Sequence, residues 1–269
     1  MNLMDEVDKI KTEGYSEANA EAKLCQDIII NAIAKSSLNR NVTIKGGVVM
    51  RSLSGEIRRA TQDIDLDFLR YSISEESIKI FVEKLNCLKG IHLRIISPIE
   101  ELKHQDYKGK RLYVEVSDDE GNVLSSKMDV GVHKDLDIEQ EEYCFDVCFD
   151  EESASVLINS KAQMIVEKLK SMLRFGTRST RYKDVFDICY LADSVDRNQL
   201  RQCIEKYIFS DSTLGVSDYE EVRKRTERIF TSNAYKRQVE RSRKNWLDMS
   251  VEEVLKKNLD FVLELTKNR

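Results

Sequence analysis

Apolar and polar residues alternate with two different periods along the chain, and the change of period predicts its organisation. In the first 158 residues many apolar positions alternate with polar ones, as in 111–117 and 123–132, which is typical of half-buried β-strands. Beyond them, apolar residues recur at every third or fourth position, as expected for amphipathic helices. The sequence therefore predicts an α+β fold, with a mixed sheet and flanking helices over residues 1–158 and a helical domain over residues 159–269.

The individual elements follow from apolar spacing and capping residues. A helix over 16–35 begins at Ser16, a favoured N-cap residue. Strands are predicted over 42–44, 63–69, 91–96, 111–117, 123–132, 143–149 and 154–158, and a further helix begins at Ser74. Later helices are predicted over 159–173, 182–192, 197–209, 217–230, 232–243 and 251–266. The polar cluster at 118–122 predicts a hairpin turn.

Residues 42–67 contain two features that bear chemistry, and the first is a Gly-Gly turn. A short apolar strand runs through Lys45 into Gly46 and Gly47. The two glycines allow a sharp turn and a close approach of the backbone to a ligand. Residues 48–54 can then begin a helix whose free N–H groups and positive dipole end face the turn. This arrangement predicts a phosphate-binding site.

The second feature is the acidic strand Asp63-Ile64-Asp65-Leu66-Asp67. Because alternate residues of a strand share a face, Asp63 and Asp65 project together. Neighbouring carboxylates repel each other unless a cation lies between them, and hard oxygen ligands suit Mg²⁺ beside substrate phosphates. Taken singly, a Gly-Gly pair is most often a plain turn and an Asp-x-Asp pair an exposed strand face. Their combination is more specific.

Strand, Gly-Gly turn, short helix and acidic strand together resemble the nucleotidyltransferase superfamily typified by DNA polymerase beta. Within it, Lys45-Gly46-Gly47 and the later Arg59-x-Thr61-x-Asp63-Ile64-Asp65 are similar to the AbiEii/AbiGii toxin group, which includes the MenT toxins.

Two downstream motifs strengthen this resemblance. They are Ala162-x-x-x-x-Glu167-Lys168-Leu169 and Arg181-Tyr182-Lys183-Asp184-x-x-Asp187-Ile188, similar to the group's third and fourth motifs. The resemblance spans residues 43–191, and the four motifs occur in the expected order. It is specific for the family and much less so for the substrate.

The resemblance implies a nucleotidyltransferase-like sheet and a catalytic role for Lys168 and Asp184. Lys168 would neutralise charge that builds on the triphosphate. Asp184 could bind the base or ribose, position Lys168 or cap its own helix. Without the resemblance, Lys168 would be interpreted as a solvated helix lysine. Lys45 and Thr61 are further candidates for contact with phosphate, although turn chemistry explains Thr61 equally well.

A third metal carboxylate is expected on a neighbouring strand, because polymerase-like members of the superfamily often have one that helps to activate the attacking hydroxyl. Asp129, in Lys127-Met128-Asp129-Val130, is the best candidate. Its side chain is expected opposite the apolar face of its strand. The alternative is an ordinary acidic residue on a strand surface. Asp67 is treated as peripheral to the site.

Composition and charge narrow the class of protein. The chain has 41% hydrophobic and 34% charged residues and a net charge of −5, which argues against a uniformly cationic nucleic-acid binder. Residues 223–244, however, contain nine basic and two acidic residues and are a candidate contact for an RNA backbone. A solvated helix face with i,i+4 ion pairs is the favoured interpretation. Tyr235 and Phe230 could stack on bases but are expected in the core.

The expected location is a reducing cytoplasm. The N-terminus lacks the basic region and apolar run of a signal peptide, and no stretch reaches the length of a transmembrane helix. The six cysteines are scattered without a Cys-x-x-Cys spacing, which indicates free thiols.

The leading hypothesis is a Mg²⁺-dependent nucleotidyltransferase similar to the toxin of an AbiE-type toxin–antitoxin or phage-defence pair. The resemblance implies transfer of a nucleotide from an NTP to RNA, with the 3′ end of tRNA as the expected acceptor, and a separately encoded antitoxin. Two alternatives stay open. One is nucleotidylation of a small-molecule or protein hydroxyl, and the other is a non-catalytic nucleotide- or RNA-binding module.

Overall fold

The computed structural model describes residues 1–102, 109–133, 137–150 and 152–267. It divides into two compact units, Met1–Asn159 and Ser160–Arg269. The first contains a mixed sheet with flanking helices and the second is helical. The predicted α+β class is confirmed.

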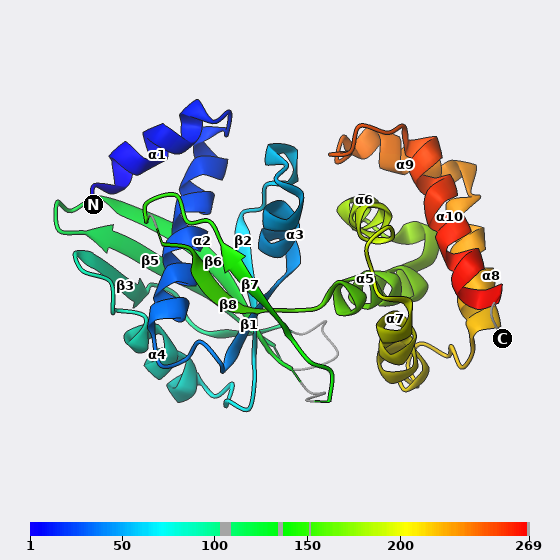
Figure 1. Cartoon of the computed structure of the whole chain (residues 1–269), viewed down its shortest axis with the longest axis horizontal. Coiled ribbons are helices and arrows are strands. Elements are labelled where there is room, and N and C mark those ends of the chain that lie inside the picture. Colours follow the sequence, from blue (N-terminus) through cyan, green and yellow to red (C-terminus); the bar gives the residue numbers. More distant parts are fainter. Residues whose placement is uncertain (103–108, 134–136, 151, 268–269) are drawn as a thin grey trace. The chain divides into compact units, whose positions relative to one another are not determined.

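The first unit is built on one eight-stranded sheet (Figure 1). Its strand order is β3-β5-β6-β2-β1-β8-β7, and β4 also pairs with β5. The strands are β1 (Val42–Lys45), β2 (Asp63–Phe68), β3 (Ile91–Ile95), β4 (Glu100–Leu102), β5 (Gly109–Asp118), β6 (Val123–Val132), β7 (Glu141–Phe145) and β8 (Ala154–Ile158). The acidic strand β2 lies between β6, with which it pairs in parallel, and β1, with which it pairs antiparallel.

Helices lie on the apolar side of this sheet. They are α1 (Leu3–Thr12), α2 (Glu17–Lys35), α3 (Gly46–Ser54), the short 3₁₀ turn η1 (Ile57–Arg59) and α4 (Glu75–Lys84). Helices α2, α3 and α4 contact strands, α2 on β6 and β8 and α4 on β3, and α1 packs on α2. Ile64, Leu66 and Met128 are fully buried on the apolar side. Because residues alternate along a strand, the carboxylates of β2 point the other way.

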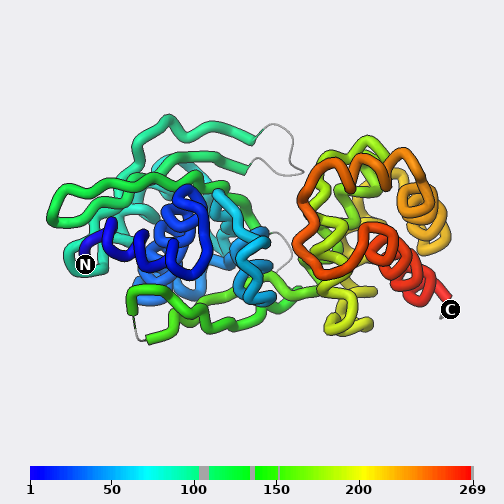
Figure 2. The backbone as a smooth tube through the Cα atoms, turned by 90° about the horizontal axis from the view of Figure 1, so that it is seen from above, coloured from blue at the N-terminus to red at the C-terminus, as the bar shows by residue number. Residues whose placement is uncertain are grey.

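Helix α1, which packs on α2 (Figure 2), is absent from the sequence prediction. Its signals are present: the Asn2 side chain caps it, and Leu3, Val7 and Ile10 are buried at helical spacing. Its position is fixed by a distant contact, because the Leu3 amide donates to the Asp118 carboxylate at 2.9 Å.

The predicted strand over 143–149 is wrong in its bounds, because β7 runs from Glu141 to Phe145. Beyond Phe145 the backbone leaves its partner strand, and the Cys148 amide donates to the Asp27 carboxylate at 3.2 Å. A buried polar group on α2 thus replaces a ladder hydrogen bond.

The second unit is made of helices. They are α5 (Lys161–Phe175), the 3₁₀ turn η2 (Gly176–Arg178), α6 (Tyr182–Leu191), α7 (Arg197–Ile204), the π-helical turn η3 (Glu205–Phe209), α8 (Tyr219–Phe230), α9 (Asn233–Ser242) and α10 (Val251–Lys267). Helix α10 packs beside α8 and α6 (Figure 1). The predicted helix over 197–209 consists of two consecutive segments, the α-helix α7 and the π-helical turn η3. In the described part of the chain, no helix has the length and apolarity needed to cross a bilayer.

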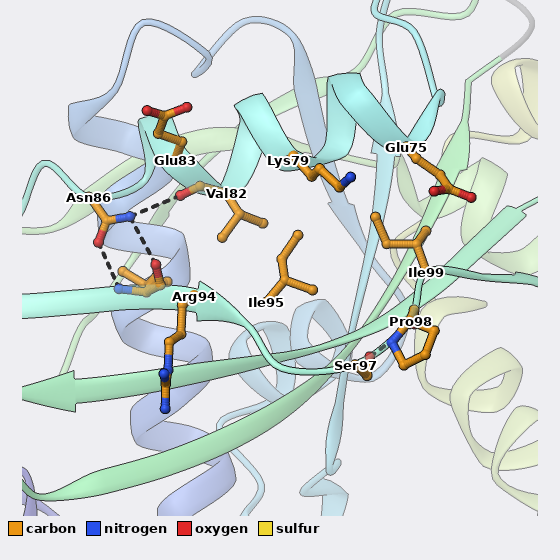
Figure 3. Close-up of a pocket in the computed structure, with 11 residues that line it drawn as sticks. Glu75, Lys79, Val82, Glu83, Asn86, Arg94, Ile95, Ser97, Pro98 and Ile99 are labelled. Atoms are coloured by element: carbon orange, nitrogen blue, oxygen red, sulfur yellow. Dashed lines mark hydrogen bonds between the residues drawn. The ribbon is translucent and has the colours of Figure 1, made fainter.

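A cavity of about 590 Å³ opens between α4 and the edge strand β3 (Figure 3). Val82, Ile95 and Ile99 give it an apolar lining. Beside it, the Asn86 amide donates to the Leu93 carbonyl at 2.9 Å and accepts from the Leu93 amide at 2.7 Å. The Asn86 side chain thereby satisfies the backbone N–H and C=O groups of Leu93 at the outer edge of the sheet. The cavity is separated from β2 by two strands.

Candidate active site

Carboxylates from two adjacent strands lie side by side in the first unit. Strands β2 and β6 are parallel, and their register places Asp65 opposite Asp129 and Asp63 opposite Lys127. Adjacent strands are about 4.8 Å apart, and paired residues point to the same face. Asp63, Asp65 and Asp129 therefore project from one face of the sheet. The common face of Asp63 and Asp65 and the position of Asp129 on a neighbouring strand agree with the sequence analysis, and the metal-binding role of the three residues stays a prediction.

Two cations on the same face pair with these acids. Lys127 Nζ lies 2.6 Å from Asp63 Oδ2. Arg111, opposite Asp129 on β5, donates from Nε and Nη2 to the two carboxylate oxygens at 2.8 and 2.7 Å. This hydrogen-bonded pair raises the pKa of the Arg111 guanidinium. Among the described residues, no three His, Cys, Asp or Glu side chains are grouped as metal ligands.

The Gly-Gly turn lies directly against the acidic strand. Gly46 begins α3 with a left-handed φ of +70°, and a β-carbon there would overlap the Asp65 carboxylate. Antiparallel pairing of β1 with β2 places Lys45 opposite Asp65. The start of α3 and the Asp65 carboxylate therefore share one small volume. Free N–H groups at a helix start favour anions.

Gly47 holds the loop that leads into β2. A β-carbon at Gly47 would lie 2.7 Å from both Cβ and Oγ1 of Thr61, so that this close contact requires glycine. The Thr61 carbonyl accepts a hydrogen bond from Gln26 Nε2 at 2.9 Å. Thr61 is thus packed against the turn, which agrees with a role in turn chemistry.

This loop is supported by three buried polar side chains that were not among the residues predicted from the sequence. Arg51 of α3 donates to Gln26 Oε1 at 2.6 Å and to Asp27 Oδ1 at 3.3 Å. All three side chains are at most 5% exposed. They connect α2, α3 and the start of β2. The signal was present in the sequence, since Gln26 and Asp27 interrupt the apolar run of α2.

Lys45 and Asp67 form a separate pair at the far end of the acidic strand. Lys45 Nζ lies 2.8 Å from the Asp67 carboxylate, which is 3% exposed. Asp67 therefore has a cation of its own on β1.

Lys168, Asp184 and Asp187 meet in the core of the second unit. Lys168 Nζ lies 2.8 Å from Asp187 Oδ2 and 3.4 Å from Asp184 Oδ1. Arg181 Nε donates to the other Asp184 oxygen at 2.9 Å. Lys168 is 6% exposed, Asp184 is 4% exposed and Asp187 is fully buried. The structure thus brings the last two motifs together, with Asp187 as the nearer partner of Lys168.

Aromatic side chains surround this buried cluster. Trp246 donates from its indole Nε1 to Asp187 Oδ1 at 3.1 Å. Tyr235 is fully buried, and burial, together with the nearby Asp184 charge, raises the pKa of its phenol. Trp246 lies outside the motifs, and no spacing in the sequence links it to Asp187.

Basic residues of the segment 223–244 form ion pairs along their helix, as the favoured interpretation of the charge pattern expected. Arg223 pairs with Glu220 at 2.6 Å and with Glu227 at 3.1 Å along α8. Arg225 pairs with Glu221 at 2.7 Å. Phe230 and Tyr235, the candidate stacking residues, are 6% and 0% exposed and belong to the core.

Comparison with known proteins gives one match over most of the chain. Residues 28–265 match the family model described as nucleotidyl transferase AbiEii toxin, type IV TA system. No curated protein matches the chain. The matched range includes the Gly-Gly turn, the acidic strand and the buried lysine cluster.

Proposed function

Because the chain belongs to the AbiEii family of nucleotidyl transferase toxins from type IV toxin–antitoxin systems, we propose that it transfers a nucleotide from an NTP to RNA with the help of Mg²⁺. The observation that carries this proposal is the register of Asp65 with Asp129 beside the Gly46 turn. The family implies a cognate antitoxin as partner. The 3′ end of tRNA is the acceptor that we propose to test first.

The donor atoms on the acidic face of the sheet are of the kind that binds a divalent cation, although, among the residues that the structure describes, the three carboxylates are not yet grouped around one point. Asp63, Asp65 and Asp129 offer carboxylate oxygens from one face and adjacent strands, which is the chemistry that Mg²⁺ prefers. To hold it, Asp63 and Asp129 would exchange their contacts with Lys127 and Arg111 for the ion. When bound, Mg²⁺ neutralises charge on the phosphate oxygens during transfer.

The chain's own groups have distinct roles in this proposal. The N–H groups at the start of α3 bind the triphosphate beside Asp65, with Lys45 and Thr61 as neighbours of this turn. Asp129 orients the attacking hydroxyl from the β6 side and accepts its proton. Lys127 and Arg111 limit the repulsion between the carboxylates on this face.

In the second unit, Lys168 and Asp184 are the charge-bearing residues to which the family resemblance assigns a role. Lys168 lies there between two carboxylates, those of Asp184 and Asp187. A protonated lysine can stabilise negative charge on a triphosphate.

Label transfer tests the proposal. Purified protein is incubated with Mg²⁺, each α-labelled NTP in turn and total tRNA. The control is the Asp63→Ala/Asp65→Ala variant, which loses two same-face carboxylates of β2. Label on tRNA that is lost in this variant and in excess EDTA is the expected result, and the NTP that gives it identifies the base.

Two other outcomes would overturn parts of the proposal. Label on a small molecule or on protein, with none on RNA, would retain nucleotidyl transfer and replace the acceptor. NTP binding without any labelled product would indicate a non-catalytic nucleotide-binding module.

A further inference from the structure

The face of the sheet that carries the acidic residues also carries an exposed aromatic ring. Tyr113 of β5 is 44% exposed, and on β5 the neighbouring Leu112 and Val114 are fully buried on the opposite, helix-covered face. The Ile96 amide donates to the Tyr113 carbonyl at 3.0 Å and extends the pairing of β3 with β5. Ile96 is itself 46% exposed. Tyr113 and Ile96 are thus two exposed apolar residues joined by a backbone hydrogen bond, and together they are called the apolar patch.

This patch is in register with the proposed catalytic residues. Tyr113 is opposite Lys127, and Lys127 is opposite Asp63 and contacts it at 2.6 Å. Two strand spacings place the Tyr113 backbone about 10 Å from that of Asp63. In the adjacent row, Arg111 contacts Asp129. Across the strands, Lys127 therefore lies between Tyr113 and Asp63. Arg111, the second cation, lies in the next row beside Asp129.

The patch lies across the acidic strands from the Gly46 turn. The Gly46 turn follows β1, whereas Tyr113 lies on β5, and the order β5-β6-β2-β1 puts them on opposite sides of the acidic strands. In phosphoryl and nucleotidyl transfer the attacking oxygen and the leaving oxygen are roughly in line through phosphorus. With the triphosphate at the Gly46 turn, the attacking hydroxyl approaches from the β6 and β5 side.

We infer that Tyr113 is the stacking residue for the terminal base of the RNA acceptor, with Ile96 beside it and Arg111 and Lys127 near the adjoining phosphate. This inference rests on the proposed function. An exposed aromatic face binds any base by stacking, and neighbouring cations bind the backbone, which is how proteins hold single-stranded RNA without reading its sequence. The alternative, that Tyr113 is only a favourable strand residue, assigns it no effect on RNA.

The inference is tested with three variants of the full chain. Tyr113→Ala removes the ring, and Tyr113→Phe keeps it. Val123→Ala is the matched control, because Val123 is a 51% exposed apolar residue on β6 of the same sheet and is paired with Ser117 rather than with the acidic row. Thermal unfolding of each variant checks that the sheet is intact.

Two readouts separate binding of the acceptor from binding of the NTP. The first is the affinity for a short fluorescein-labelled single-stranded RNA, measured by anisotropy without NTP. The second is the pair of KM values for tRNA and for NTP in the label-transfer assay. We expect Tyr113→Ala to weaken RNA binding and raise the KM for tRNA by about 5- to 100-fold with an unchanged KM for NTP. Tyr113→Phe and Val123→Ala should match the wild type.

The possible failures are distinguishable. If the wild type labels tRNA and Tyr113→Ala has the same RNA affinity and the same KM, the stacking role is wrong and the proposed function stands. If the wild type transfers label only to an acceptor other than RNA and does not bind the oligonucleotide, both the RNA acceptor and the stacking role are wrong. A Tyr113→Ala variant that raises both KM values equally would also contradict an acceptor-specific role.

Discussion

Gly46 leaves no room for a side chain because the Asp65 carboxylate occupies the position that its β-carbon would take. The residue that starts α3 and the central acid of β2 are therefore in mutual contact, although 19 positions of sequence separate them. This contact and the left-handed φ of +70° together explain why glycine is required there. The contact joins the proposed phosphate turn and the proposed metal carboxylates in one site.

The first prediction compares Gly46→Ala with Gly55→Ala. Both glycines have left-handed backbones, with φ of +70° and +67°, so each substitution should cost about 1–2 kcal/mol in unfolding free energy. At Gly55, no described atom lies within 4 Å of the added β-carbon. Only Gly46→Ala displaces the Asp65 carboxylate, and we expect its transfer rate to fall by about 100-fold or more. Urea unfolding and label transfer measure the two effects, and equal rates in both variants would contradict the shared site.

The second prediction concerns the role of Asp129. Asp129→Asn removes the charge opposite Asp65 and should lower kcat by about 10²- to 10⁴-fold if this carboxylate accepts the proton of the attacking hydroxyl. Glu115→Gln is the control, because Glu115 lies on the neighbouring strand β5, on the same face of the sheet as Asp129, and pairs with Arg94. Its kcat should stay near that of the wild type. Retained kcat in Asp129→Asn would remove this residue from the catalytic set.

The third prediction concerns the partner of Lys168. Asp187→Ala should lower the free energy of unfolding by about 3–5 kcal/mol, because it leaves a buried ammonium and the Trp246 indole without their common acceptor. Asp193→Ala breaks an exposed pair with Lys257 in the same unit and should cost about 0–1 kcal/mol. Urea unfolding followed by tryptophan fluorescence tests this, since Trp246 is the single tryptophan of the chain. Equal losses would contradict the buried-pair interpretation.

Local patterns were sufficient for most of the fold and for the residues around Gly46. Strand alternation predicted the common face of Asp63 and Asp65, and apolar spacing predicted the long helices. The position of Asp129 beside Asp65 depended on a parallel pairing of strands about 60 residues apart, which periodicity does not encode. The resemblance to polymerase-like nucleotidyltransferases supplied that expectation.

Residues whose role depends on distant contacts could not be identified from the sequence. Arg111 is part of an ordinary alternating strand until its register places it on Asp129. Trp246 gives no local indication that it binds Asp187. The end of β7 at Phe145 was missed because the chain beyond it turns to α2, where the Asp27 carboxylate accepts from the Cys148 amide. Such contacts follow from the tertiary arrangement rather than from propensity.

The last prediction concerns pH and the docking of α1 through Asp118. Burial raises the pKa of this carboxyl, but hydrogen bonds from Asn122 and the amides of Leu3 and Glu120 outweigh it and lower the pKa to about 2. A carboxyl whose pKa is lower in the folded state stabilises the fold above its unfolded pKa and loses that contribution as pH falls through the folded value.

Asp118→Asn cannot ionise, so its stability deficit relative to the wild type should be constant above about pH 5 and shrink between about pH 4 and pH 2. Urea unfolding of both proteins across this range, followed by circular dichroism, measures the difference. Asp119→Asn is the control, since Asp119 is an exposed neighbour whose carboxylate pairs with the likewise exposed His92. A deficit of equal size at pH 3 and pH 7 would show that the charge of Asp118 does not hold α1 in place.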